Sequence, residues 1–159
     1  MSFRVDFNAQ LTVIETPTVG TADVQKPQVR HDAFNRAVTQ KNTDTPPASI
    51  DSSQTLTGTQ TIDLTALPTV NGIVDCTGKK VRYLQIKNRS TNTGKLAIGP
   101  GAANPYSMFG AGISKDLQLD GHQLERFGDG LAAVAAGAKT ILITPNNVAD
   151  VFDIQLVLG

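Results

Sequence analysis

The sequence predicts an all-β protein, an antiparallel β-sandwich or jelly roll preceded by an extended N-terminal arm. Thr supplies 18 of the 159 residues and charged residues only 18%, a composition typical of pleated surfaces covered by β-branched side chains. Short alternating apolar runs recur about every ten residues, with Gly, Asn and Asp between them. Thirteen of the 14 glycines follow residue 50. We therefore expect two regions, an arm with short strands over 1–53 and a β-sandwich domain over 54–159.

The first region begins with an alternating pattern and then loses it. Apolar and polar residues alternate over 3–15, which predicts one or two short strands. Residues 16–53 are rich in Pro and small polar residues and bury too little apolar surface to offset their ordering entropy. Fully extended, this segment spans roughly 120 Å, so we expect an arm that reaches a neighbouring subunit; the alternative is an arm that wraps its own domain. The apolar stretch 33–38 fits a helical turn or a strand, and its Phe34 and Val38 are candidate interface residues.

The second region contains nine candidate strands separated by turn residues. The clearest is 151–158, where the even-numbered residues from Phe152 to Leu158 are all large and apolar, which predicts one buried face. The alanine-rich stretch 131–138 fits either a turn of helix or a loop across the end of the sandwich. The other candidate strands are 61–65, 72–75, 81–88, 95–98, 106–109, 115–119, 123–127 and 139–144.

Charge and hydropathy disfavour two classes of partner. The 14 basic and 14 acidic residues cancel, whereas proteins that bind nucleic acid or an anionic membrane usually carry a basic excess. No apolar run approaches the roughly 20 residues that span a bilayer, and residues 1–6 lack the features of a signal peptide. We therefore expect no nucleic acid and no membrane as partners, and synthesis in a cytoplasm.

Residues that carry enzyme chemistry are few and scattered. His31 and His122 form no metal-ligand spacing. His122 has Asp120 and Glu125 nearby in sequence, yet an exposed hairpin residue is the simpler interpretation.

The single cysteine, Cys76, cannot form an internal disulfide. A nucleophilic cysteine needs a basic neighbour, and Lys79 and Lys80 are close in sequence, but an ordinary half-buried cysteine is the simpler interpretation. We expect no catalytic residue, no metal site and no cofactor.

Two further segments are candidate binding surfaces. Residues 79–83 hold three cations and a tyrosine, which fits an anion site or, more simply, a solvated strand end. Residues 104–110 hold three large apolar side chains between glycine-rich flanks. The simpler interpretation is a core strand. The alternative is a hydrophobic lip that docks on another subunit, for which Tyr106, Met108 and Phe109 are the candidate interface residues.

Six stretches of the chain resemble a known family. In chain order they are TIDLTAL at 61–67, DCTGKKV at 75–81, LQIKN at 84–88, GAANPYSMFG at 101–110, AKTILIT at 138–144 and IQLVLG at 154–159. Together they resemble the small β-sandwich structural proteins of tailed bacteriophage virions, of the capsid cement or decoration type. The resemblance covers roughly residues 55–159, and it implies a jelly-roll-like fold without catalytic residues to carry over.

The resemblance implies a non-enzymatic virion protein that bridges and stabilises major capsid protein subunits. The implied partners are the major capsid protein or other virion proteins, with a homo-oligomer, trimer or dimer, as the state of the chain. Its place would be the virion, assembled in the host cytoplasm. Two alternatives stay open. One is a neck, tail or baseplate component or fibre adaptor of the virion. The other is a carbohydrate-binding β-sandwich module, which the lack of Trp disfavours.

Overall fold

Strands are the only regular secondary structure in the described part of the chain, which confirms the all-β class. The computed structural model describes residues 4–15, 29–41, 43–44 and 47–159, and within these ranges it contains no helix, hence none that could cross a membrane. The strands are β1 (Arg4–Glu15), β2 (Val29–Lys41), β3 (Ile50–Thr57), β4 (Gln60–Asp63), β5 (Leu67–Thr69), β6 (Gly72–Val74), β7 (Val81–Asn88), β8 (Leu96–Pro100), β9 (Lys115–Leu117), β10 (His122–Arg126), β11 (Thr140–Pro145) and β12 (Val151–Leu158).

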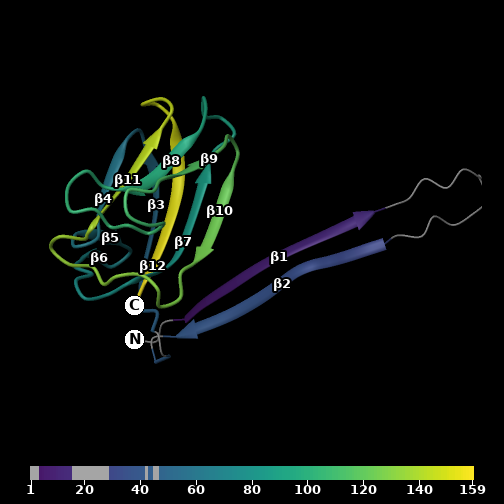
Figure 1. Ribbon diagram of the computed structural model, residues 1–159, viewed down its shortest axis with the longest axis horizontal. Coiled ribbons are helices and arrows are strands. Elements are labelled where there is room, and N and C mark those ends of the chain that lie inside the picture. The colour runs from purple at the N-terminus through teal and green to yellow at the C-terminus, as the bar shows by residue number, and fades with distance from the viewer. Residues whose placement is uncertain (1–3, 16–28, 42, 45–46) are drawn as a thin grey trace, which may run out of the picture.

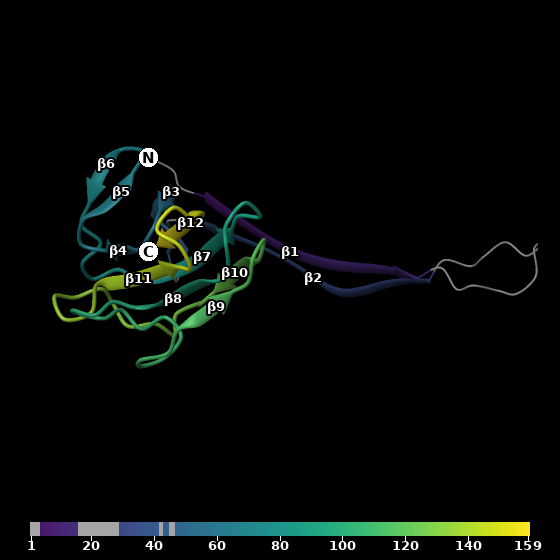
Figure 2. The ribbon, with the colours of Figure 1, turned by 90° about the horizontal axis from the view of Figure 1, so that it is seen from above.

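Eight of the strands form two four-stranded antiparallel sheets that face each other (Figure 2). One sheet has the order β10-β7-β12-β3 and the other has the order β4-β11-β8-β9. Most strands that follow each other in the chain lie in opposite sheets, and the last strand, β12, lies between β3 and β7. This is the double-sheet jelly roll, so the predicted sandwich is confirmed. The short β5–β6 hairpin forms a separate sheet that contacts β3.

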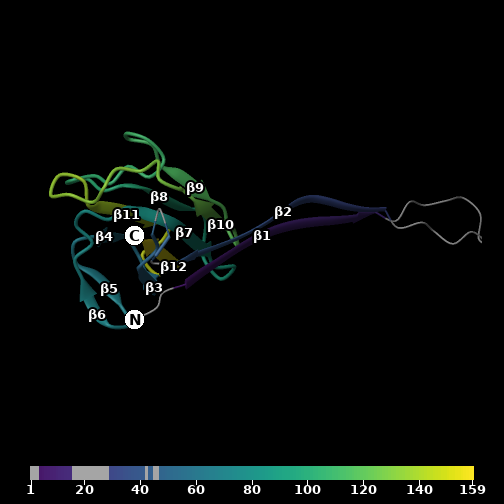
Figure 3. The same cartoon turned by 90° about the horizontal axis from the view of Figure 1, so that it is seen from below.

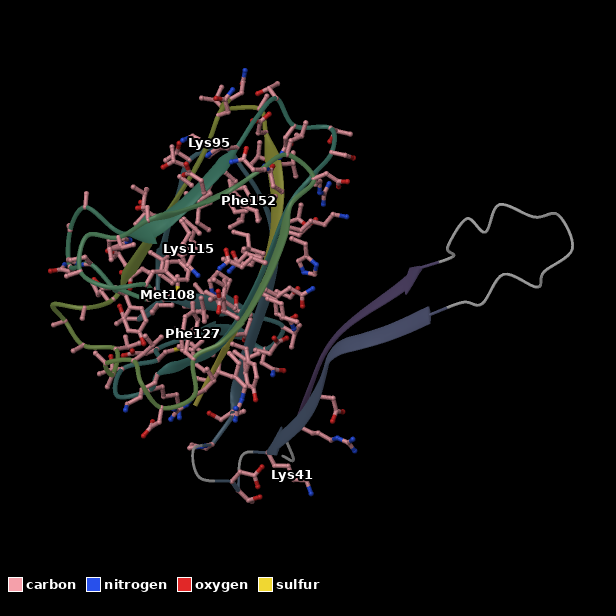
Figure 4. The ribbon with its side chains drawn as sticks, turned by 45° about the vertical axis from the view of Figure 1, so that its right-hand side comes forward. Lys41, Lys95, Met108, Lys115, Phe127 and Phe152 are labelled. Atoms are coloured by element: carbon pink, nitrogen blue, oxygen red, sulfur yellow. The ribbon has the colours of Figure 1, made fainter. Side chains whose placement is uncertain are left out.

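The core lies between the two sheets and is supplied by alternate residues of the central strands. The four even-numbered residues of β12, from Phe152 to Leu158, are at most 3% exposed, which confirms the predicted buried face. Ile141 and Ile143 of β11 are fully buried opposite them. Figure 4 shows Phe152 within the space between the sheets. Each such side chain contributes about 1.5–3 kcal/mol when it leaves water.

Two apolar segments of the sequence form loops rather than strands or helices. Residues 106–109 form a loop rather than a strand. Strand β11 is already paired on both sides, by β4 and β8, so this segment cannot pair with it as a further strand. Within 106–109, the backbone N–H of Tyr106 donates to the Thr140 carbonyl of β11 at 2.8 Å. Residues 131–138 are a loop that ends in a tight turn between Ala135 and Ala138, so the loop alternative was correct.

Strand β3 begins before the predicted start of the sandwich. It pairs with β12 over its whole length, from Ile50 opposite Leu158 to Thr57 opposite Val151. The preceding Ala48 is fully buried. The sandwich therefore starts near residue 47 rather than at 54. The sequence IDSSQTLT hid this strand because an edge strand exposes alternate residues and tolerates small polar side chains.

The N-terminal region forms a long antiparallel ribbon, β1–β2, that projects away from the sandwich (Figures 1 and 3). Residues 3–15, predicted as one or two short strands, supply the single 12-residue strand β1. Residues 29–41, predicted as part of an extended arm, form a 13-residue strand, so of the two alternatives for 33–38 the strand is correct. Pairing with β1 satisfies backbone groups that a lone arm would leave to solvent. The remainder of that arm, 16–28, lies outside the described residues.

Candidate interaction surface

Metal-ligating side chains do not gather in the described part of the chain. No group of three His, Cys, Asp or Glu residues there could hold a metal ion. His122 begins β10 and is exposed, as the hairpin interpretation predicts. The neighbouring Glu125 is bound by Lys115 Nζ at 2.8 Å, and this bond is the main cause that lowers the pKa of its carboxyl. His31 lies in β2, and its side chain is outside the described part.

The one cysteine is more deeply placed than the sequence predicted. Cys76 is fully buried rather than half-buried. Burial is the main cause that raises the pKa of its thiol to about 11, and the negative charge of Asp75 adds to the effect. The reactive thiolate is therefore scarce near neutral pH.

Asp63 and Asp153 are further carboxylates whose pKa values are lowered and which are held in ion pairs. Asp63 accepts hydrogen bonds from Lys139 Nζ at 2.8 Å and from the Thr65 hydroxyl at 2.7 Å. These bonds lower the pKa of Asp63 from 3.8 to about 2. Asp153 is held by Arg89, with Nη2 to Oδ1 at 2.6 Å, and its pKa is lowered mainly by this bond. Both groups are ionised at neutral pH, which makes them poor general acids.

Two of the three cations at residues 79–83 share one carboxylate, that of Asp129. Arg82 is 4% exposed, and its Nη1 donates to Asp129 Oδ1 and to the Gly128 carbonyl, both at 2.6 Å. Lys80 Nζ reaches the same Asp129 oxygen at 3.1 Å. Arg82 Nε is buried without a hydrogen-bond partner. Arg82 is thus buried and ion-paired, rather than part of the solvated strand end that was expected.

Two of the predicted interface residues belong to the core. Tyr106 and Met108 are 2% and 5% exposed. The Tyr106 hydroxyl donates to the Ala132 carbonyl at 2.8 Å and accepts from the Val81 N–H at 3.2 Å. The docking lip is therefore wrong for these two side chains, and the simpler interpretation, a place in the core, is correct for both. Figure 4 shows Met108 turned toward the interior of the sandwich.

Phe109, the third residue of that segment, is half-buried at the side of the sandwich. Its ring lies 6.0 Å from that of Phe127, centroid to centroid, in a tilted arrangement. Lys115 Nζ lies over the same ring, 4.5 Å from its centre. Phe34 and Val38, the other predicted interface residues, lie in β2, and their side chains are outside the described part.

Large exposed apolar side chains of the sandwich are few. Val70 and Ile73, at the tip of the β5–β6 hairpin, are 90% and 76% exposed. Val148 lies in a separate loop, before β12, and is also exposed. Scattered residues of this kind are normal on a soluble protein and do not define a binding surface.

The foot of the ribbon is tied to the sandwich through a short connection. The Lys41 carbonyl accepts from the Ala48 N–H at 3.1 Å, and Asp44 Oδ2 accepts from the Lys41 N–H at 2.7 Å. Ala48 packs with Tyr83 and Val157 on the outer face of the β10-β7-β12-β3 sheet. Figure 4 places Lys41 at this foot. The ribbon is thus anchored at one end.

Strand pairing divides the ribbon into two faces of opposite character. Directly opposed residues share a face, and successive residues alternate between faces. Eight of the twelve residues on one face are apolar, against two of twelve on the other. The apolar face carries Val5, Phe7, Ala9, Leu11, Val13 and Glu15 opposite Gln40, Val38, Arg36, Phe34, His31 and Val29. The polar face carries Arg4, Asp6, Asn8, Gln10, Thr12 and Ile14 opposite Lys41, Thr39, Ala37, Asn35, Asp32 and Arg30.

An amphipathic ribbon of this kind is the best candidate for an interaction surface. A two-stranded ribbon alone is marginally stable in water, and stability normally requires further strands or packing on its apolar side. The face defined above includes the predicted residues Phe34 and Val38, which the pairing places opposite Leu11 and Phe7.

Comparison with known proteins identifies no relative of the chain. No protein-family model, curated protein or solved structure matches it. The resemblance to virion proteins therefore rests on the six sequence stretches alone.

Proposed function

We propose that this chain is a non-enzymatic structural protein of a tailed-phage virion, a cement protein that lies on the capsid and stabilises the lattice of major capsid protein subunits. The observation that carries the proposal is the projecting ribbon. It is anchored to the jelly roll at its foot and presents an amphipathic surface beyond it (Figure 1). The sandwich supplies one contact with the assembly and the ribbon supplies another.

Two linked contacts explain how such a protein would hold firmly. A ribbon of twelve residues reaches roughly 40 Å from its foot, far enough to extend beyond its own sandwich to a neighbouring subunit. Once the sandwich is seated, the ribbon binds at high effective concentration, so two weak contacts combine into stable attachment. A cement protein needs this property because it must join subunits that assemble independently.

The chemistry of the sandwich supports a structural role. Its ion-paired carboxylates and its buried cysteine are suited to stability rather than to proton or group transfer. Jelly rolls occur in viral capsids and in lectins, and the fold alone does not choose between them. The six stretches favour the virion. Sugar binding has less support, because the chain lacks Trp and both tyrosines are buried.

The proposal is tested on particles produced with and without the protein. Particles lacking it are reloaded with the full chain or with a form that begins at residue 47, and copies per particle are counted by quantitative mass spectrometry. The full chain should bind in hundreds of copies and raise the temperature at which heads rupture, and the ribbon-deleted form should bind at much lower occupancy. Equal heat survival with and without the full chain would remove the cement role. Six or twelve copies would favour the neck or tail alternative.

A further inference from the structure

The backbone of the ribbon extends beyond its own sandwich over most of its length (Figure 1). The ribbon runs outward from its foot, and the three views agree that its far end lies away from both sheets (Figures 1, 2 and 3). The central rows of this face pair Phe7 with Val38 and Leu11 with Phe34. A surface of this composition is stabilised when another apolar surface covers it and removes it from water.

We propose that the occupant is a second copy of this chain, whose ribbon packs its own apolar face against the first. Two ribbons joined in this way form a small four-stranded sandwich with their polar faces outward, the layered packing that β-structure commonly uses. The inference deepens the proposed function, and rests on it for its setting, since it names the neighbour that the ribbon contacts on the particle.

The charge of the apolar face favours a copy of itself over a charged foreign surface. The face carries one Arg and one Glu, Arg36 and Glu15, on different strands and three rows apart. The net charge of the face is zero with His31 neutral, so two copies of the face brought together carry no excess of either charge. A face selected for a charged foreign surface would carry a surplus of the opposite sign. Symmetric interfaces between identical subunits require this kind of self-complementarity.

The size of the face sets the expected strength of the pairing. Twelve residues at about 3.4 Å each and two strands about 4.8 Å apart give a face of roughly 40 Å by 10 Å. Two such faces remove on the order of 800 Å² from water, below the roughly 1,200–2,000 Å² of stable specific complexes. The pairing should therefore be reversible and concentration-dependent in solution, and favoured where a particle surface holds many copies close together.

The first test measures the mass of the full chain by sedimentation equilibrium over a wide concentration range. The double variant Leu11→Asp/Phe34→Asp alters one row of the apolar face. Its matched control, Gln10→Asp/Asn35→Asp, places the same two carboxylates on the adjacent row of the polar face. The unaltered chain and the control should gain mass with concentration, and the apolar-face variant should stay monomeric. Equal melting temperatures of the three would show that the sandwiches are intact. A full chain that stays monomeric throughout, or two variants that associate alike, would overturn the inference.

A second test does not depend on introducing charge into the ribbon. Leu11→Cys and Gln10→Cys each introduce one thiol, and the strand register places the two on opposite faces, while the native Cys76 is buried. A short bis-maleimide should link Leu11→Cys chains into dimers several-fold more efficiently than Gln10→Cys chains. Equal yields would contradict face-to-face pairing.

The two proposals fail in distinguishable ways. If the Leu11→Asp/Phe34→Asp chain binds particles and protects them as the full chain does, the ribbon pairing is wrong and the cement role stands. If the full chain forms the expected dimers but adds no heat resistance to particles, the cement role is wrong and the pairing stands.

Discussion

The boundary between ribbon and sandwich gives the sharpest prediction about stability. A chain that begins at residue 47 should keep the stability of the full protein to within about 1 kcal/mol, because the ribbon extends away from the core (Figure 1). A chain that begins at residue 51 should be clearly weaker, although it lacks only four more residues. Those four include Ala48, Ser49 and Ile50, which join the sandwich.

The size of the difference follows from what these residues contact. Burying the Ala48 methyl group, which is fully enclosed, contributes about 0.8 kcal/mol. The Ser49 N–H donates to the Leu158 carbonyl at 2.8 Å, a bond of about 0.5–1.5 kcal/mol. Ile50 is half-buried against the core and contributes about 1 kcal/mol. Together the loss is about 2–4 kcal/mol, a large part of the 5–15 kcal/mol that stabilises a typical domain.

Urea unfolding followed by circular dichroism measures both truncated chains. The two should unfold with similar dependence on urea concentration, and the shorter chain should have the lower midpoint. Equal midpoints would refute the placement of residues 47–50 in the sandwich. Failure of the longer chain to fold would refute the independence of the sandwich from the ribbon.

Three further predictions concern the sandwich itself. Leu156→Ala should lower the free energy of unfolding by about 2–5 kcal/mol, because the Leu156 side chain is 1% exposed. The control Gln85→Ala, on the exposed face, should change the free energy of unfolding by less than about 0.5 kcal/mol in the same urea titration. The ion pair of Asp63 with Lys139 contributes its full stability above pH 3.8 and loses it as the pH falls toward 2. Because Asp63→Asn lacks this ion pair, its melting temperature should fall less between about pH 6 and pH 2.5 than that of the unaltered protein. An equal fall in both proteins would assign the acid sensitivity to other groups. Cys76 should react with a thiol reagent many-fold more slowly in the folded protein than in urea, and comparable rates would contradict its burial.

The sequence was most informative where alternation and burial coincide. β7 and β12 have the predicted bounds. β12 has one consistently apolar face, which makes its alternation plain. In β7 the apolar face is shorter, because the buried Arg82 and Asn88 interrupt it at both ends. β3 was missed because its edge position leaves alternate residues exposed and permits Ser, Gln and Thr. β2 was recognised only in part, as the strand alternative for 33–38, because its alternation changes phase near Phe34, where the pairing register shifts after Leu11. A phase change of this kind is visible only once the partner strand is known.

The candidate surface was only partly within reach of sequence reasoning. Phe34 and Val38 were identified as interface residues, and strand pairing places both on the apolar face of the ribbon. For Tyr106 and Met108 a core position was the simpler interpretation and the interface the alternative, and both side chains are buried. Large apolar residues in a loop have the same local sequence whether the loop turns them inward or outward, so their burial depends on tertiary packing that the sequence pattern does not encode.

Hydrogen–deuterium exchange tests most directly whether the ribbon is an attachment element and the sandwich a self-sufficient body. In the dilute full chain, amides of β1 and β2 should exchange rapidly, because an isolated two-stranded ribbon is marginally stable, while β7 and β12 should be strongly protected. In the assembled protein the ribbon amides should become protected and those of β7 and β12 should change little. Ribbon amides protected as strongly as those of β12 in the dilute monomer, with no change on assembly, would contradict the account.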